Sequence, residues 1–321
     1  MITRGLFDSV LLQPALGGAD TLYVVSGYAT PAMAYEHFSS LERPFRVNLI
    51  VGMCPRDGIG RGNHLGFQRL SAEDKPDHFS CRYLVEPPPA HSKVYAWSRG
   101  TNPEKGFSGS ANYSLNAFGT DQRETISEDD PLECLDYYNR LLSETRDCCD
   151  EDIEDLINIY DEIRSGSRAR DQHDVPMAED RGNQPDYGTE SVTLSFLDRS
   201  GNLPGRSGLN WGQRPEYNRD PNQAYIRVPV DVQRSGFFPE RSRHFLVRTD
   251  DERIILCTRA QDNGKAIESP EDNSVLGLYF RNRLGVAPGR LVTKEDLLHY
   301  GRTDVVFYKI DEENYYMDFS R

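Results

Sequence analysis

The sequence has few cysteines, and it has no long apolar segment. Six cysteines are spread over 321 residues without a CxxC pair, which excludes the disulfide framework of a small secreted domain. The histidines, cysteines and carboxylates nowhere have the spacing of a zinc site, so we expect no structural metal. Cys148 and Cys149 are adjacent within a helical pattern, where we expect two packed thiols. No apolar run approaches the roughly 18 residues that a membrane span needs.

The N-terminal segment also lacks the apolar core of a signal peptide, because Asp8 and Gln13 interrupt it early. Hydrophobic residues make up 37% of the chain and aromatic residues 10%, which is typical of a soluble globular protein and too aromatic for general disorder. We therefore expect a cytoplasmic protein.

The net charge of −14 argues at first against a nucleic-acid partner. The acidic residues, however, are concentrated in residues 121–180, and the regions on either side are close to neutral. Since the attraction of DNA depends on the local potential, the net charge does not exclude DNA binding.

The first 120 residues alternate short apolar runs with turn signals. Strands are predicted at 22–26, 45–51, 81–85, 92–97 and 106–108. A helical stretch at 33–41 separates the first two strands. This alternation favours an α/β layer fold with a mixed or parallel sheet.

From Pro131 the apolar residues recur at helical spacing. The pattern predicts two amphipathic helices with acidic outer faces, one around 135–142 and one over 153–163. Their apolar stripes fit either a core or a dimer interface. Residues 166–190 are polar, acidic and rich in turn formers, which is typical of a linker. The predicted domains are therefore 1–165 and 191–321.

The second domain has a β pattern. Strands are predicted at 225–230, 243–248, 253–258 and 305–310. Residues 275–281 fit either a helix or a strand, and a short helix begins after Thr293, which can cap it. Closely spaced strands with one or two short helices indicate a small barrel-like domain.

One group of polar residues in the first domain can carry chemistry. His91 and Lys93 are two residues apart on a predicted strand, so their side chains leave the same face. Ser110 and Asn112 follow the next strand in a small-residue turn, where backbone N–H groups can approach an anion. A histidine nucleophile, a lysine that binds phosphate oxygens and an amide donor can together perform phosphoryl transfer without a metal or another cofactor.

The HxK motif followed by GSxN resembles the signature of the phospholipase D superfamily of phosphodiesterases. That signature usually has an aspartate four residues after the lysine, whereas this chain has Trp97. The same departure occurs in the restriction-endonuclease branch, the NgoFVII-like and BfiI-like enzymes, in which a nuclease domain precedes a B3-like DNA-recognition domain. The resemblance implies a phospholipase D-like mixed sheet with flanking helices, followed by a mainly β, B3-like pseudobarrel. It also implies a sequence-specific DNA endonuclease that acts without metal.

The resemblance further implies roles for individual residues. The superfamily mechanism uses two HxK motifs and this chain has one, so two chains would each supply His91 in a homodimer formed through the N-terminal domain. One His91 would form a covalent phosphohistidine while the other protonates the leaving oxygen. Glu124 stands where an acidic residue orients the catalytic histidine of these nucleases, and Ser110 would contact the phosphate.

Two loops of the second domain are rich in side chains that read base edges. In the B3-like domains that this half resembles, two such arms grip the major groove of double-stranded DNA. The residues are Arg206, Asn210, Trp211, Gln213 and Arg214 in the first loop and Arg259, Gln261, Asn263 and Lys265 in the second. An ordinary polar hairpin is the alternative for each loop.

Other functions stay open at this stage. A phospholipase D-like lipid phosphodiesterase would share the phosphate pocket, and a sequence-specific DNA-binding regulator would have an inactive nuclease domain. Asp57 with Glu73 and Lys75 loosely matches the D…ExK pattern of Mg²⁺-dependent nucleases, although Glu73 and Lys75 lie in a polar loop.

A separate methyltransferase or a helper ATPase would be the protein partner, and no membrane partner is expected.

Overall fold

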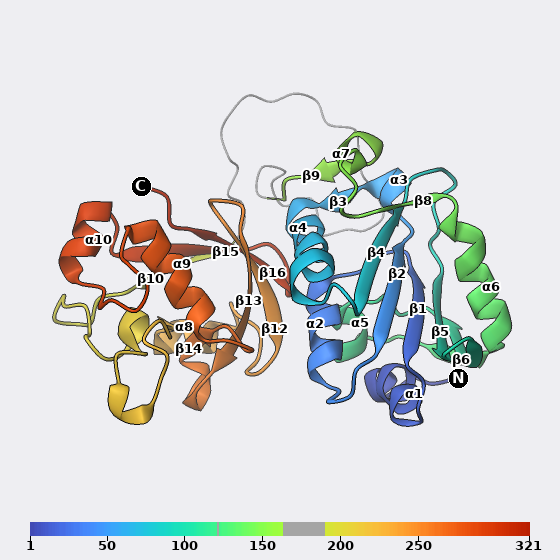
Figure 1. Ribbon diagram of the computed structural model, residues 1–321, viewed down its shortest axis with the longest axis horizontal. Coiled ribbons are helices and arrows are strands. Elements are labelled where there is room, and N and C mark those ends of the chain that lie inside the picture. The colour runs from blue at the N-terminus through green and yellow to red at the C-terminus, as the bar shows by residue number, and fades with distance from the viewer. Residues whose placement is uncertain (121, 163–189) are drawn as a thin grey trace. The chain divides into compact units, whose positions relative to one another are not determined.

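The computed structural model of the chain describes residues 1–120, 122–162 and 190–321 (Figure 1). The chain divides into two compact units, Met1–Asp161 and Glu162–Arg321. Apart from Glu190, the predicted linker lies outside the described residues. Among those residues, none of the helices has the length and apolar character needed to cross a membrane.

The first unit is built on a seven-stranded mixed sheet in the order β7-β6-β5-β1-β2-β4-β8. Its strands are β1 (Thr21–Ser26), β2 (Arg46–Val51), β4 (Phe79–Leu84), β5 (Lys93–Arg99), β6 (Asn102–Gly109), β7 (Ile126–Asp129) and β8 (Thr145–Asp147). The strands β1, β2 and β4 are parallel, whereas β5 pairs antiparallel with β1. This is the mixed sheet that the alternating pattern predicts.

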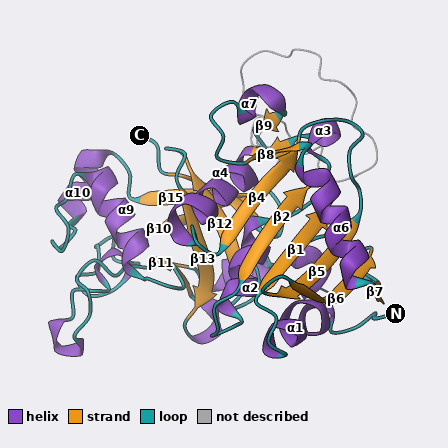
Figure 2. Cartoon of the chain, turned by 45° about the vertical axis from the view of Figure 1, so that its right-hand side comes forward, coloured by secondary structure: helices purple, strands orange, loops and turns teal. Residues whose placement is uncertain are grey.

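Helices cover both faces of this sheet. They are α1 (Gln13–Leu16), α2 (Pro31–Ser39), α3 (Cys54–Asp57), α4 (Arg61–Arg69), α5 (Leu115–Gly119), α6 (Pro131–Leu142) and α7 (Ile153–Leu156). The helices α2 and α4 lie on one side of the sheet and α6 on the other (Figures 1 and 2). The side chain of Asp130 caps α6 by accepting hydrogen bonds from Leu132 N and Glu133 N, which satisfies N–H groups that a helix start leaves open.

Two local predictions in this unit are wrong. The helix expected over 153–163 ends at Leu156, and β9 (Ile159–Tyr160) follows, paired in parallel with β3 (Ile59–Gly60). Strand pairing with a distant segment overrides the helical period of the sequence. Cys148 and Cys149 lie in the turn after β8 and not in a helix, because the antiparallel pairing of β8 with β4 fixes this segment.

The second unit has a sheet in the order β10-β15-β16-β12-β13-β14-β11. Its strands are β10 (Ser191–Ser195), β11 (Ile226–Arg227), β12 (His244–Thr249), β13 (Ile254–Ala260), β14 (Ala266–Glu268), β15 (Asp304–Lys309) and β16 (Asn314–Asp318). The two end strands β10 and β11 approach each other, so the sheet is a nearly closed barrel around an aromatic core. This is the predicted mainly β pseudobarrel.

The described part of the second unit also contains the α-helices α8 (Val230–Ser235), α9 (Ser274–Leu284) and α10 (Lys294–Tyr300), and short 3-10 helices at Gly208–Asn210, Pro215–Tyr217 and Asp262–Gly264. The segment that fitted either a helix or a strand is therefore helical. Thr293 caps α10 as predicted, in a capping box with Asp296.

Candidate functional site

The polar residues of the HxK and GSxN motifs meet at one edge of the first sheet. The parallel strands β1 and β2 end there, and Lys93, the first residue of β5, pairs with Ser26, the last residue of β1. Strand β6 runs antiparallel to β5 and ends at Gly109, beside the start of β5. The loops that follow β1, β2 and β6 and precede β5 are therefore neighbours.

Glycines at this edge let the chain that carries His91 pack closely. A Cβ atom on Gly27 would lie 3.2 Å from Cδ2 of His91, and one on Gly52 would overlap the carbonyl oxygen of Ala90. Backbone bonds hold the same chain, since Gly27 N donates to Ser92 O at 3.1 Å and Ala90 N donates to Gly52 O at 2.9 Å. The place of His91 is thus set by backbone contacts on either side of it.

His91 lies just before β5, whereas the sequence predicted it on the strand, with its side chain on the same face as that of Lys93. The two side chains still meet: the Lys93 ammonium donates to His91 Nε2 at 3.2 Å and to His91 O at 2.7 Å. Because an ammonium group can only donate, Nε2 carries the lone pair in this arrangement. His91 is exposed, while Lys93 is buried, and this burial lowers the pKa of Lys93 against the opposing charge of Glu124.

Asn112 is held by its carbonyl oxygen. Oδ1 accepts a hydrogen bond from Tyr28 N at 3.1 Å and lies 3.3 Å from the hydroxyl of Ser26, which donates to Tyr28 O at 2.5 Å. The buried Ser26 hydroxyl also accepts from Tyr113 N at 2.9 Å, which ties the two loops together. With its oxygen held inward, Asn112 has its amide N–H groups to offer to an anion.

Ser110 and Glu124 form a second part of this edge. The Ser110 hydroxyl donates to Glu124 Oε2, and Gln122 Nε2 donates to Glu124 Oε1 at 2.7 Å. Thr125 N donates to the Ser110 hydroxyl at 3.0 Å. Glu124 is 8% exposed, so its carboxylate lies inside the site although it begins the acidic segment of the sequence. The arrangement fixes Ser110, which is itself exposed.

Sequence reasoning missed Tyr28 as a member of this site and placed Asp57 in a different one. The Tyr28 ring packs edge-on to His91 with a centroid separation of 6.0 Å, and its hydroxyl donates to Asp57 Oδ2 at 2.5 Å. Burial, with the hydrogen bond to Asp57, raises the pKa of Tyr28 to about 12. Although burial opposes it, hydrogen bonds from Arg56 and Tyr28 lower the pKa of Asp57. The sequence signal that could have identified Tyr28 is its position just after the predicted strand at 22–26, because functional residues often follow the ends of parallel strands.

The D…ExK pattern does not correspond to one cluster of side chains. Asp57 is bound by Tyr28 and Arg56, whereas Glu73 pairs with Arg69 at 4.0 Å. Lys75 lies over the ring of Phe38, 5.9 Å from its centroid. These residues serve different local networks, and the pattern arises from the abundance of acidic residues.

Trp97 stands where phospholipase D-type motifs have an aspartate, and it belongs to the core. Its side chain is fully buried, and its indole N–H donates to Val10 O at 2.8 Å. Alternation along β5 puts Trp97 on the same side as Lys93 and Tyr95, deeper in the unit. The substitution therefore fills the interior and leaves the His91–Lys93 pair at the sheet edge unchanged.

In the second unit, the structure places three of the predicted DNA contacts in structural roles. Asn210 is fully buried and donates to Pro204 O and Val292 O while accepting from Val292 N. Arg259 is 9% exposed and its guanidinium donates to the carbonyls of Gly264 and Pro239. Gln213 Nε2 donates to Pro221 O and Gly289 O. Buried groups with these partners do not present donors to a base edge in this structure, so we expect structural roles for Asn210 and Arg259, and Gln213 has only its amide oxygen left.

The remaining loop residues stay accessible. Arg206 pairs with Glu216 but is 61% exposed, and Arg214 Nε donates to Arg206 O at 2.8 Å. Arg219 stacks over the Trp211 ring, 4.1 Å from its centroid. In the second loop, Gln261 and Asn263 have positive φ angles of 62° and 58°, and Asn263 is exposed together with Lys265.

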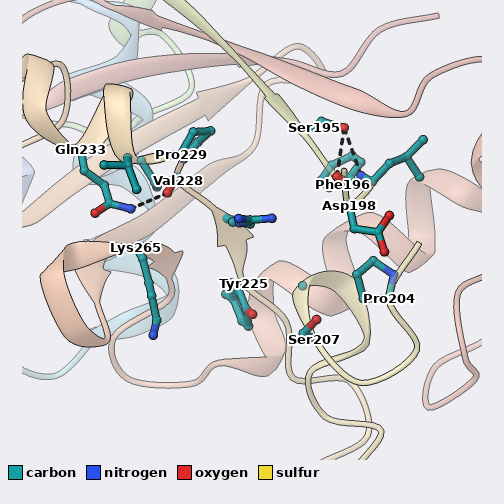
Figure 3. A pocket seen from close by; sticks show the side chains of 14 residues that line it. Ser195, Phe196, Asp198, Pro204, Ser207, Tyr225, Val228, Pro229, Gln233 and Lys265 are labelled. Atoms are coloured by element: carbon teal, nitrogen blue, oxygen red, sulfur yellow. Dashed lines mark hydrogen bonds between the residues drawn. The ribbon is translucent and has the colours of Figure 1, made fainter. Parts of the chain in front are cut away.

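The two loops meet at one pocket of about 360 Å³. Strand β11 follows the first loop and pairs with β14, which follows the second, so pairing brings the loops together. Ser207 and Tyr225 line the pocket from the first side and Lys265 from the second (Figure 3). Arg227, on β11, also lines it and is exposed, although sequence reasoning did not select it. Its position in a predicted strand hid it.

Two protein-family models match the chain, and between them they cover most of it. Residues 4–157 match the model described as the NgoFVII restriction endonuclease N-terminal PLD domain, where PLD stands for phospholipase D. Residues 186–311 match the NgoFVII C-terminal B3-like DNA-binding domain. The two matches have the order and nearly the boundaries of the two structural units.

Comparison with solved structures gives more distant similarities. NucT from Helicobacter pylori is 20% identical, with a TM-score of 0.31, over 46% of this chain and 96% of that one. The phospholipase D family member Nuc from Salmonella typhimurium is 14% identical, with a TM-score of 0.32, over 45% and 89% of the two chains. Polyphosphate kinase from Porphyromonas gingivalis is 15% identical, with a TM-score of 0.31, over 50% of this chain and 24% of that one. No curated protein matches the chain.

Proposed function

Because this chain belongs to the NgoFVII restriction endonuclease family, we propose that it cleaves DNA at a specific short site through a phosphohistidine intermediate and without a metal ion. As a member of this family, the chain is a phosphodiesterase of the endonuclease type. It has a nuclease domain and a DNA-binding domain. The meeting of His91, Lys93 and Asn112 at one sheet edge is the observation that supports the chemistry.

In the proposed first step, Nε2 of His91 attacks the phosphorus, and the bond from phosphorus to the leaving oxygen breaks. Lys93 and the Asn112 amide donate to the non-bridging oxygens, whose negative charge grows in the transition state. The Ser110 hydroxyl donates its one proton to Glu124 in this structure, so it becomes a third donor when that proton turns to the phosphate. These donors supply the charge stabilisation that Mg²⁺ gives in other nucleases. Lys93 leaves Nε2 as the phosphate arrives, which frees the lone pair for attack.

The leaving oxygen needs a proton, and a single HxK motif cannot supply both roles. We assign the acid to His91 of the partner subunit in a homodimer formed by the first unit. The same imidazole then removes a proton from water, and the hydroxyl attacks the phosphohistidine and releases the histidine. Protons and bonds balance over the two steps: one phosphodiester bond and one water are consumed.

In the second unit, the proposed reading surface is the rim of the pocket between the two loops. Arg206, Asn263 and Lys265 supply exposed donors. Arg214 and Trp211 are half-buried in the same loop as Arg206, and Arg219 covers one face of the Trp211 ring. Arginine and lysine contact guanine or phosphate, and asparagine suits adenine. Arg227 joins this set because it lines the same pocket.

A plasmid-cleavage assay in excess chelator tests this function. We expect wild type to cleave and His91→Ala to be inactive, while DNA binding changes by less than tenfold because His91 and the reading loops lie in different units. Denaturing gels of a 32P-labelled oligonucleotide should show a protein-linked phosphate that acid removes and base preserves. Cleavage that requires Mg²⁺ would contradict the proposed chemistry, DNA binding without cleavage would identify a regulator, and hydrolysis of phospholipid instead of DNA would identify a lipid enzyme.

A further inference from the structure

The turn after β8 brings together metal-binding groups that the proposed nuclease chemistry does not use. A carboxylate oxygen of Asp147 and the sulfurs of Cys148 and Cys149 all lie within 4.8 Å of one another. Cys148 is buried and Cys149 is exposed, so the group has one side open to solvent. We propose that this turn binds one thiophilic divalent cation, of the Zn²⁺ and Cd²⁺ class, through Asp147, Cys148 and Cys149.

The spacing of the sulfurs fits such an ion. Cys148 Sγ and Cys149 Sγ are 3.8 Å apart. Zinc–sulfur bonds of about 2.3 Å at tetrahedral angles place two thiolate sulfurs about 3.8 Å apart. A cation can therefore bridge the two sulfurs with little movement, whereas a disulfide would require them to approach by almost half that distance. Hard cations such as Mg²⁺ prefer oxygen ligands and do not match this set.

The backbone of the turn is held in place without any ion. Cys148 N donates to Cys81 O at 3.0 Å on the neighbouring strand β4, and Gln68 Nε2 donates to Cys148 O at 2.9 Å. Cys149 N donates to Asp147 Oδ1 at 2.9 Å, and Oδ2, which lies 3.9 Å from Arg82 Nη1, is the carboxylate oxygen that would turn to a cation. Three ligands from one fixed turn leave a fourth position for water.

Thiolates, not thiols, are the form of cysteine that binds a divalent cation. Binding must therefore release protons: one divalent cation and two thiols give one dithiolate complex and two protons. Affinity should rise with pH for this reason. The acidic segment around the turn attracts cations and partly offsets the cost of deprotonation.

The test uses the full-length protein, reduced and freed of reductant, titrated with Cd²⁺ alone. We expect thiolate-to-cadmium absorption in the ultraviolet that saturates at one ion per chain, release of two protons, and displacement by Zn²⁺. Cys149→Ser, at an exposed position, should remove most of the absorption and weaken binding at least tenfold. Asp147→Asn should weaken binding but retain the absorption. Cys134→Ser is the control for a thiol outside the group and should bind as wild type.

Circular dichroism of Cys149→Ser verifies that the variant is folded. Absence of saturable absorption in reduced wild type, or unchanged binding in folded Cys149→Ser, would overturn the site. The proposal does not depend on nuclease activity. Cleavage in chelator by Cys149→Ser and by wild type separates the two questions, since a His91-based reaction should proceed equally in both.

Discussion

A dimer in which one subunit lacks His91 gives the sharpest test of a composite active site. The perturbation is His91→Ala in one subunit only, obtained by co-expressing two differently tagged chains and purifying the species that carries both tags. If each reaction needs a nucleophile from one chain and an acid from the other, one intact His91 cannot complete a turnover.

The size of the effect follows from where the other histidines lie. His37, His64 and His244 are buried, and His78 Nδ1 bonds to Phe45 O. These histidines therefore cannot replace the missing acid, and the remaining described one, His299, is exposed on α10 of the second unit. Loss of a positioned general acid typically costs 10²–10⁴-fold in rate, so the mixed dimer should retain at most about 1% of wild-type cleavage. If wild-type and His91→Ala chains are mixed in equal amounts and pair at random, about one quarter of the dimers would contain two wild-type chains and be fully active.

The assay is single-turnover cleavage of a labelled site in chelator, with a doubly tagged wild-type dimer as the control. DNA binding by the mixed dimer should match that control, because the reading loops are intact in both chains. Retention of half the wild-type rate would show that each chain completes the reaction alone, and an active monomer in sedimentation would have the same meaning. Either result would direct attention to an acid on the same chain, with Tyr28 beside His91 as the first candidate.

Three further predictions concern the roles assigned by burial. Asn210→Ala should lower the free energy of unfolding in urea by about 2–4 kcal/mol, because it leaves buried groups around Val292 without partners; unchanged stability would return Asn210 to the reading surface. Lys265→Ala should weaken DNA binding and should reduce by about one the slope of the logarithm of the binding constant against the logarithm of salt concentration. Lys309→Ala, at a lysine paired with Glu312, should change neither the binding constant nor this slope. Burial lowers the pKa of His64 to about 4 and that of His37 to about 3, so the unfolded state binds more protons below pH 6.5. As the pH is lowered from 6.5 to 4, each histidine should therefore reduce the free energy of unfolding by up to about 1.4 kcal/mol per pH unit, and His64→Gln should make this dependence less steep by its share.

The sequence was informative about the fold wherever the hydrophobic period and the tertiary pairing agree. The runs at 22–26 and 45–51 end at glycines, and the strands β1 and β2 end at those places. The helical period over 153–163 failed because Ile159 and Tyr160 pair with a segment about 100 residues away in the sequence, as β9 with β3. Such pairing is fixed by the packed sheet and leaves no local signal.

The candidate site likewise contains residues that a local motif predicts and residues that only the strand pairing brings in. His91, Lys93 and Asn112 form a spaced motif, so the sequence could suggest that they meet. Tyr28 and Ser26 enter only because β1 is the neighbour of β5, and no motif predicts that neighbour. In the second unit, residue type favoured Asn210 and Arg259 as base readers, but a side chain that can read a base can equally bind backbone carbonyls in the interior. Exposure decides between these uses, and composition does not determine exposure.

The proposed metal-free chemistry depends on the structure of the sheet edge. Lys93 is a buried cation placed at hydrogen-bond distance from the proposed nucleophile, and the carboxylate of Glu124 is close enough to stabilise that charge. The ammonium group of Lys93 can therefore stay charged in the free site without a counter-ion from solvent, and it can bind the phosphate of the substrate. Replacing Trp97 by an aspartate would put a second negative charge into the core, where it has no such partner. The sheet edge where β5 begins thus holds the ammonium of Lys93, the imidazole of His91 and the amide of Asn112, while Trp97 packs in the core.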